Sequence, residues 1–354
     1  MYFNALSNFW KYTLHYRRDQ LEKAKKAINK CIKVNESILE TPPSRMLYAY
    51  EAMGKVSSRL GDWKAAKDNF QKAIRSIDLE KLDGNHYSVR ILNEYINHLL
   101  KINSFDSAFY YTNKVLNQNQ GTLVDKDNTN EQLMVSQLIN TLSTKAELIG
   151  IHFERTRNID YLLQANSCYL TAIDLTMRTK NSYRNPKNRV WFNVKVQAVF
   201  DNATSLEYDL LQSTKSSKYF DLLFTIIENS RSNSILKSVN QSLFKSSYGI
   251  PDTLNLRLLN LQQQSSYLTN QINQLESKNN LSQKDSTKLT EFRSVLLENK
   301  VAFNNLMLHL EQNYPNYYEV NYNPQVASIQ TVKDHLKSNE ALLEYFVGSD
   351  GIYA

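Results

Sequence analysis

The sequence predicts an all-α protein in which a solenoid of stacked helical pairs precedes an antiparallel helical hairpin and the first strands of a truncated α/β domain. Only 8 of the 354 residues are glycine and 6 are proline, whereas glycine usually makes up ~7% of a globular protein. One segment recurs at a constant spacing, and the leucine spacing becomes heptad-like after residue 250. Few turn formers combined with helical periodicity favour long helices.

A repeat of 42 residues is the strongest of these signals. Three segments align without gaps at this spacing, namely Leu21–Ile32, Trp63–Ile74 and Phe105–Leu116. The same small residue occupies one column of the alignment, at Ala24, Ala66 and Ala108. Apolar columns at i, i+3, i+7, i+10 and i+11 fall on one face of a helix, and the alanine lets a neighbouring helix approach closely. Each helical pair therefore leaves an apolar face that the next pair covers.

The middle copy resembles the tetratricopeptide repeat. The residues that carry the resemblance are Tyr50, Met53, Gly54, Leu60, Gly61, Trp63, Ala66, Phe70 and Ala73. The resemblance implies antiparallel helices stacked into a protein-binding solenoid. The period exceeds the commonest length of about 34 residues, so we expect extended helices or connections. The third copy has Thr112 in the aromatic column and lacks the turn glycine, so it is expected to be a degenerate repeat.

A further repeat is predicted after the polar loop Asn119–Asn130. A helix over Tyr161–Leu175 restores the alternation of small and aromatic residues through Ala165, Tyr169 and Ala172. Gly249, Ile250 and Pro251 mark a boundary. We therefore assign residues 1–250 to the helical repeat domain.

Residues 251–314 predict an antiparallel helical hairpin. Apolar residues alternate spacings of four and three along Leu254–Leu275 and again along Leu289–Leu310, which is typical of a coiled-coil seam. A short loop, Lys278–Leu281, joins the helices, and Ser282 with Asp285 resembles a capping box. The polar residues in the seams are Ser265 and Asn299. They either fix the register of the two helices or leave the seam locally hydrated.

Residues 315–354 change to a strand pattern after one short helix over Val326–Leu336. Ala341–Val347 is expected to be a buried strand, Gly348–Gly351 a turn, and Ile352–Ala354 the start of a second strand. An isolated hairpin is marginally stable in water. We therefore expect the fragment of a larger domain, or strands supplied from elsewhere.

The C-terminal motifs look like the opening of a CHAT domain, the caspase-like peptidase domain that follows tetratricopeptide repeats in many bacterial proteins. They are Tyr317–Asn323, Val326–Gln330 and Asn339–Gly348, and the segments Glu228–Leu236 and Tyr248–Pro251 resemble the linkers that precede such domains. The resemblance implies a His-Cys dyad that cleaves a peptide bond. In the family this dyad lies beyond the opening strands, so no catalytic residue maps onto this chain and its status as an enzyme stays open.

No other motif points to catalysis, a metal or a cofactor. Cys31 and Cys168 fall at packed positions of the repeats, and a reactive thiol needs a nearby base in an electropositive setting. The six histidines show no ligand spacing; they are His15, His86, His98, His152, His309 and His335. The sequence contains neither a glycine-rich phosphate loop nor a nucleophile elbow.

The net charge of +7 leaves two interpretations open. Much of the excess lies in the first helices, and phosphates attract basic stripes, so a basic nucleic-acid-binding adaptor is one alternative. The lysines occupy the polar face of an amphipathic helix, however, and a solvated face is favoured. Nucleic acid is therefore not the expected partner.

The concave face of a solenoid is lined by the first helix of each pair. By repeat position, the residues predicted to bind a peptide are Tyr48, Glu51, Lys55, Arg59, Arg90, Asn93, Asn97 and Lys101. Basic side chains there could hold a peptide's carboxylates and the amides its backbone. The alternative is a solvated wall, or one filled by the next helices of the chain.

These features predict a non-catalytic scaffold that recruits or regulates substrates for a C-terminal caspase-like cysteine peptidase domain beyond this chain. The alternatives are the regulatory half of a complete CHAT endopeptidase and the nucleic-acid adaptor. Met1 is not followed by a charged region and an apolar core, and about eighteen apolar residues never run together. We expect a cytoplasmic protein with a protein or peptide partner, and leave open a signal peptide upstream.

Overall fold

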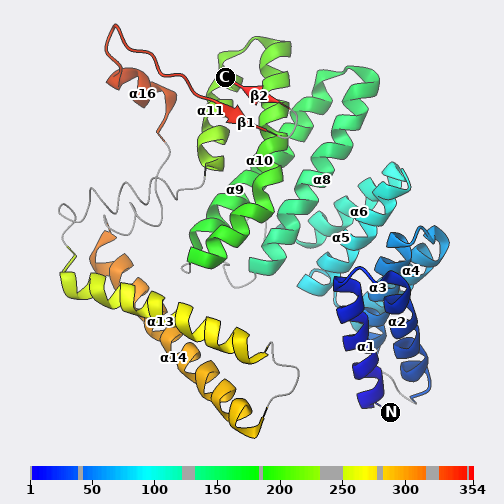
Figure 1. The fold of residues 1–354 in the computed structure, drawn as a ribbon. Coiled ribbons are helices and arrows are strands. Elements are labelled where there is room, and N and C mark those ends of the chain that lie inside the picture. Colours follow the sequence, from blue (N-terminus) through cyan, green and yellow to red (C-terminus); the bar gives the residue numbers. More distant parts are fainter. Residues whose placement is uncertain are drawn as a thin grey trace. The chain divides into compact units, whose positions relative to one another are not determined.

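The computed structural model describes residues 2–38, 43–121, 132–182, 186–231, 250–276, 282–315, 327–348 and 351–354. Helices dominate these residues, and a two-stranded antiparallel sheet lies near the C-terminus (Figure 1). This confirms the predicted all-α class. The chain divides into two compact units. One comprises Met1–Lys180, Phe192–Ile227 and Ser338–Ala354, and the other comprises Asn181–Trp191 and Glu228–Lys337.

The first unit begins with three antiparallel helical pairs. They are α1 (Tyr2–Arg17) with α2 (Leu21–Glu36), α3 (Pro43–Arg59) with α4 (Trp63–Glu80), and α5 (His86–Lys101) with α6 (Phe105–Gln118). The three aligned sequence segments begin at the first residues of α2, α4 and α6. Contacts of α2 with α3, α4 with α5, and α3 with α5 join the pairs into a stack. The structure therefore confirms the tetratricopeptide-like solenoid.

The alanine column lies at the centre of each helical pair. Ala24, Ala66 and Ala108 are fully buried. Gly54 on α3 lies so close to α4 that a methyl group in its place would be 3.0 Å from ring atoms of Phe70. Small residues thus bring the paired helices together, and the aromatic ring fills the groove beside them.

The turn within each pair uses one residue in the left-handed region. Asp19, Gly61 and Asn103 have φ values of 57°, 78° and 55° and occupy one column of the repeat. In each turn the next residue donates a backbone hydrogen bond to the carbonyl five positions earlier, at 2.9–3.0 Å. The third repeat, which lacks the turn glycine, nevertheless keeps the turn. Asparagine tolerates a positive φ better than most residues, so Asn103 makes the turn of Gly61.

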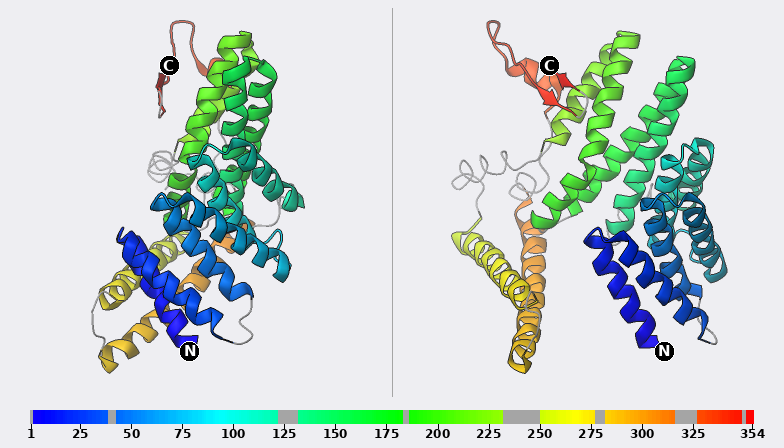
Figure 2. Two further views of the ribbon diagram at one scale, coloured as in Figure 1. Left: turned by 90° about the vertical axis from the view of Figure 1, so that its right-hand side faces the viewer. Right: turned by 45° about the vertical axis from the view of Figure 1, so that its right-hand side comes forward.

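Four more helices lie wholly or mostly in the first unit. They are α8 (Gln132–Thr156), α9 (Ile159–Ser182), α10 (Pro186–Thr214) and α11 (Ser217–Ser230), and Figure 2 shows α9 and α10 (green) lying side by side. Arg157 and Lys215 take the left-handed conformation at the turns before α9 and α11. The predicted column of Ala165, Tyr169 and Ala172 is buried on α9, which confirms the helix expected there.

The sheet consists of β1 (Phe346–Val347) and β2 (Ile352–Tyr353), with Phe346 opposite Tyr353. Phe346 packs on apolar residues of α11, and the ring of Tyr353 lies 5.3 Å from that of Tyr208 on α10. The predicted strand over Ala341–Val347 is therefore confined to its last two residues. Its expected burial was also wrong for Leu342, Leu343 and Tyr345, which are more than half exposed, whereas Phe346 is buried against α11.

The second unit contains the predicted helical hairpin, formed by α13 (Asp252–Glu276) and α14 (Gln283–Asn313), with the short helix α16 (Ile329–His335) following. Ser282 caps α14 by accepting a hydrogen bond from the Asp285 amide at 3.1 Å. In the seam, the Ser265 hydroxyl donates to Asn299 Oδ1 at 3.0 Å. The polar residues of the two helices therefore meet each other directly.

Several predicted segments lie outside the described residues. They include the loop Lys278–Leu281, most of the polar loop Asn119–Asn130, the motif Tyr317–Asn323, the larger part of the linker Glu228–Leu236 and half of the linker Tyr248–Pro251.

Candidate protein-binding site

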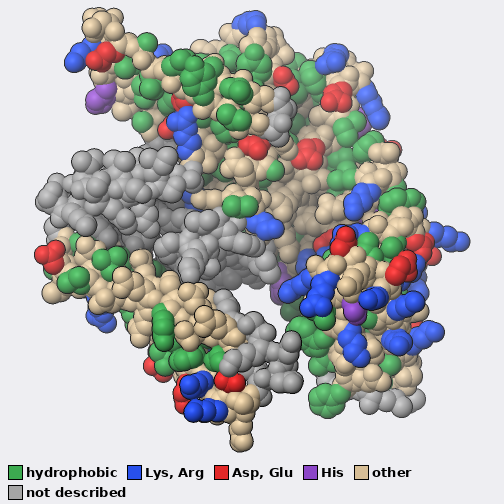
Figure 3. Space-filling model, viewed as in Figure 1, with side chains coloured by type: hydrophobic (Ala, Val, Ile, Leu, Met, Phe, Trp, Pro, Cys, Tyr) green, Lys and Arg blue, Asp and Glu red, His purple; other side chains and the backbone are tan. Residues whose placement is uncertain are grey.

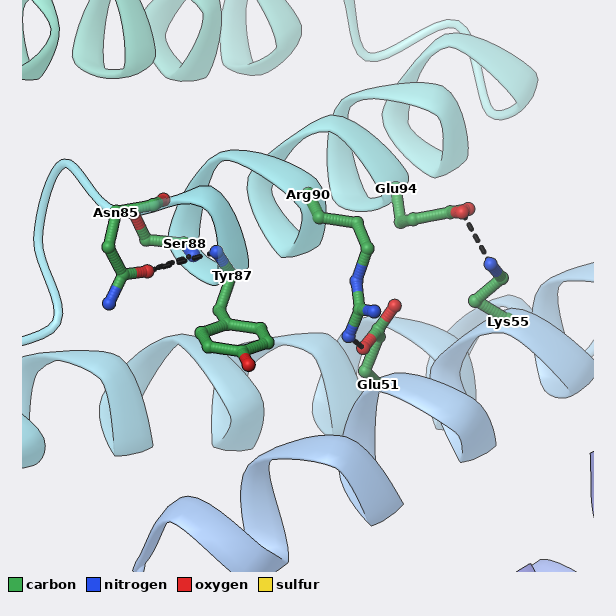
Figure 4. A network of polar contacts seen from close by, with 7 residues as sticks. All are labelled: Glu51, Lys55, Asn85, Tyr87, Ser88, Arg90 and Glu94. Atoms are coloured by element: carbon green, nitrogen blue, oxygen red, sulfur yellow. Dashed lines mark hydrogen bonds and ion pairs between the residues drawn. The ribbon is translucent and has the colours of Figure 1, made fainter. Parts of the chain in front are cut away.

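The eight predicted site residues lie on two neighbouring first helices. Tyr48, Glu51, Lys55 and Arg59 are on α3, and Arg90, Asn93, Asn97 and Lys101 are on α5. Asn85 fixes the start of α5, because its side chain accepts hydrogen bonds from the amides of Tyr87 and Ser88 at 2.9 and 3.0 Å (Figure 4). This cap fixes the residue at which α5 begins. Further along α5, Arg90 and Glu94 point toward α3 (Figure 4).

A pocket of about 530 Å³ opens beside these helices. It is lined by Ala5, Leu6, Phe9 and Tyr12 of α1, Cys31 and Asn35 of α2, Tyr48, Glu51, Ala52 and Lys55 of α3, and Arg90 of α5. Four of the predicted residues thus line one pocket. Its lining combines small residues, aromatic rings and the charged groups of α3 and α5.

The contribution of α1 was missed in the sequence, although the repeat contains the signal that reveals it. Leu6, Tyr48 and Arg90 are 42 residues apart, so they are equivalent positions of successive repeats. Phe9 and Glu51 form a second such column. Extending the repeat back by one period from α3 finds Leu6 and Phe9, but no aligned segment marks α1 itself.

A buried ion pair forms the wall between α3 and α5. Arg90 Nη2 donates to Glu51 Oε2 at 2.5 Å (Figure 4), and only 7% of the Glu51 side chain is exposed. Burial raises the pKa of the Glu51 carboxyl, while Arg90 and Lys55 lower it. The guanidinium of Arg90 also lies 5.5 Å from the centre of the Tyr48 ring, which adds a cation–π contact.

Two basic residues of α3, Lys55 and Arg59, are paired in the same way. Lys55 donates to Glu94 on α5, and Arg59 Nη2 lies 2.7 Å from Asp19 Oδ1 in the preceding turn. Both cations also lie over the ring of Tyr16. The groups expected to hold a ligand's carboxylates therefore already have carboxylate partners within the protein, and the pocket wall is close to neutral.

The remaining predicted residues lie away from this pocket. The Asn93 amide donates to the Gln137 carbonyl of α8 at 3.2 Å and accepts from the Thr141 hydroxyl at 2.7 Å. At this position the chain's own next helix occupies the wall. Asn97 and Lys101 are exposed on α5.

The titratable groups of the pocket suit binding rather than chemistry. Burial raises the pKa values of the Tyr12 and Tyr48 phenols, so both stay neutral at physiological pH. Burial also raises the pKa of the Cys31 thiol, whereas a nucleophilic cysteine needs a lowered one. The pocket offers aromatic surface, hydroxyl groups and a neutralised pair of charges.

Comparison with known proteins adds little to this geometry. No protein-family model matches the chain, and no curated protein matches it. Among solved structures, the chain is similar to one described as a functional characterisation of Pseudomonas aeruginosa pilF. The identity is 15% and the TM-score 0.29, over 61% of this chain and 95% of that chain. A likeness of this degree carries no argument about binding or activity.

None of the helices within the described ranges combines the length and the apolar character needed to cross a bilayer.

Proposed function

We propose that the chain is a protein-binding scaffold and that the pocket between α1, α3 and α5 holds a segment of a partner protein. The observation that carries this proposal is the convergence of equivalent positions from three successive repeats, at Leu6, Tyr48 and Arg90, on one pocket. Each repeat supplies a different side chain to a shared wall. Solenoids characteristically bind extended partners on such surfaces.

The chemistry of the pocket favours a neutral, apolar anchor. Its volume falls in the range of specific ligand sites, roughly 300–1,000 Å³, and its sides include Leu6, Phe9 and Tyr12. Because Glu51 and Arg90 satisfy each other, a charged ligand group would have to displace one of them. A large apolar side chain can instead displace water from the aromatic surface.

We further propose that this binding recruits or regulates substrates for a caspase-like peptidase domain beyond the chain. The support is the similarity of Asn339–Gly348 to the opening of a CHAT domain. The alternative within the same family is the regulatory half of a complete CHAT endopeptidase. The proposed organisation is residues 1–250 as repeats, 251–314 as the helical hairpin and 315–354 as the start of the peptidase domain.

The binding proposal is tested by photo-crosslinking followed by affinity measurement. A photoreactive phenylalanine at Tyr48 should crosslink a discrete segment of one partner, whereas the same group at the exposed Tyr110 of α6 should not. The identified segment, made as a peptide, should bind Tyr48→Ala about tenfold or more weakly than the unmodified chain, as expected for an aromatic anchor position. Equal binding by Tyr48→Ala and Tyr110→Ala would reject the pocket as the site.

A further inference from the structure

The outer face of α1 carries an apolar stripe that no helix of the described residues covers. Its members are spaced four residues apart, and their exposed fractions are Leu6 40%, Trp10 66% and Leu14 48%. The opposite face of α1 is buried through Ala5 and Tyr12. Single exposed apolar residues are ordinary, but a contiguous stripe marks an interaction surface.

The repeat shows what covers this face elsewhere in the molecule. Trp10 and Leu14 are equivalent to Ala52 and Val56 of α3, which are buried in a cluster with residues of α1 and α2. In α5 the residue equivalent to Leu14 is His98, which is buried and lies 3.1 Å from the Ser58 hydroxyl of α3. These columns therefore pack against the preceding helical pair, so the geometry of the α1 stripe fits an α-helix.

The charges around the stripe indicate the chemistry of that helix. Lys11, Arg17 and Arg18 are exposed beside it, and the described residues supply none of them with an ion-pair partner. Residues 1–36 contain eight Lys and Arg against three Asp and Glu, and Figure 3 shows Lys and Arg side chains gathered over the N-terminal helices. An acidic partner would complement this surface.

The ion pair between Arg59 and Asp19 indicates where a partner's carboxylate would lie on α1. Arg17 is equivalent to Arg59, and Arg59 binds the Asp19 carboxylate of the preceding repeat at 2.7 Å. By the same geometry, Arg17 is placed to bind a carboxylate at the end of a helix lying on α1. We propose that the outer face of α1 binds an acidic amphipathic α-helix of a partner protein. The partner's apolar residues pack on Trp10 and Leu14, and an acidic residue near its C-terminal end pairs with Arg17.

The test uses the full chain and three labelled synthetic helices of about six turns, followed by fluorescence anisotropy. The first helix has leucine at positions i, i+3 and i+7 on one face, glutamate on the other face, and a C-terminal aspartate. The second replaces each acidic residue by lysine, and the third scrambles the first. We expect only the acidic amphipathic helix to bind, with an affinity that falls as salt rises.

Variants then locate the binding. Trp10→Glu combined with Leu14→Glu should weaken the acidic helix about tenfold or more, while Leu79→Glu, on the exposed face of α4, should leave its affinity unchanged. Arg17→Glu should weaken it severalfold, and a helix ending in lysine should recover that loss. Tyr48→Ala, in the pocket, should have no effect, which separates the surface at Trp10 and Leu14 from the proposed peptide site, whose lining shares only Leu6 with the stripe.

Four outcomes would overturn the proposal. They are equal binding of the acidic and basic helices, no binding of the acidic helix, tighter Trp10-dependent binding to phosphatidylserine vesicles than to the helix, and a dimer in sedimentation that the Trp10→Glu and Leu14→Glu variant abolishes. The third would assign the stripe to a membrane surface and the fourth to a second copy of the chain.

Discussion

The buried carboxylate of Glu51 on α3 and the guanidinium of Arg90 on α5 are joined by a hydrogen bond of 2.5 Å. Glu51 has little access to solvent, whereas about a third of the Arg90 side chain is exposed at the pocket. The pair therefore satisfies a buried anion with a cation that a ligand can reach. It links the stability of the α3–α5 interface to the shape of the proposed binding site.

Removing Arg90 should destabilise the protein, because the buried carboxylate of Glu51 would lose its partner. We expect Arg90→Met to lower the free energy of unfolding by about 2 kcal/mol, less than for a fully buried pair because Arg90 is partly exposed. The loss should be greater at pH 8 than at pH 5, because protonation relieves a carboxylate whose pKa burial already raises. Urea unfolding at both pH values measures this. Adding Glu51→Gln to Arg90→Met should restore part of the lost free energy of unfolding. A double variant no more stable than Arg90→Met would contradict the importance of the Glu51–Arg90 pair.

Glu207 on α10 should make the stability of the repeat unit depend on pH. Its side chain is fully buried, and neither carboxyl oxygen makes a hydrogen bond of ordinary geometry among the described residues. Burial raises its pKa from 4.5 to about 7, against smaller opposing effects of a weak contact with the Asn166 side chain and of the Lys218 charge. A carboxyl with a raised folded-state pKa favours folding when protonated, so its contribution is present below pH 4.5 and is lost as pH rises to about 7.

Glu207→Gln should therefore remove this component. Relative to the unmodified chain, the variant should gain about 3 kcal/mol of unfolding free energy between pH 4.5 and pH 8. Burial also raises the pKa of the Glu147 carboxyl, but Glu147 Oε1 accepts hydrogen bonds from Asn202 at 2.8 Å and Ser143 at 3.3 Å, which oppose that shift. Glu147→Gln is therefore the comparison variant, and its gain between the two pH values should be smaller than that of Glu207→Gln. Parallel pH profiles for the unmodified chain and Glu207→Gln would contradict the prediction.

Replacing Gly54 even by alanine should destabilise the protein. Alanine at this position gains helix propensity of about 1 kcal/mol, but its methyl group would press on the Phe70 ring, and overpacking commonly costs about 1–3 kcal/mol. Phe70 is buried between Tyr95 and His98 and has little room to move. We expect a net loss and a lower thermal midpoint for Gly54→Ala. Gly150→Ala in α8, where no neighbouring atom lies within 4 Å, should raise the midpoint instead.

Substitutions at the left-handed turn residues should change the stability of the protein by different amounts. Gly61→Ala should destabilise the protein by about 1 kcal/mol, because a β-carbon is strained at φ 78°. Asn103→Gly should change stability by only a few tenths of a kcal/mol, since asparagine tolerates this region. Lys215→Gly should stabilise by up to about 1 kcal/mol by relieving the same strain. Chemical denaturation of the three variants measures their free energies of unfolding. An unchanged stability of Gly61→Ala would contradict the prediction.

The sequence determined the helices, their pairing and their turns. Small residues at Ala24, Ala66 and Ala108 and apolar residues at helical spacing act within one helix and its immediate neighbour, so their effect is visible in the linear pattern. The heptads of residues 251–314 specified the hairpin for the same reason. The repeat also placed four of the eight candidate residues at one pocket, because equivalent positions of a solenoid share a face.

Only the tertiary structure decided which charges meet and which surfaces remain open. Glu51 and Arg90 are 39 residues apart, and their contact depends on the rotation of α5 against α3. Asn93 had the sequence pattern of a site residue, yet α8 lies close enough to take both of its hydrogen-bonding groups. A helical pattern shows that a face is apolar, but packing decides what covers it. The column that buries Val56 therefore leaves Leu14 exposed.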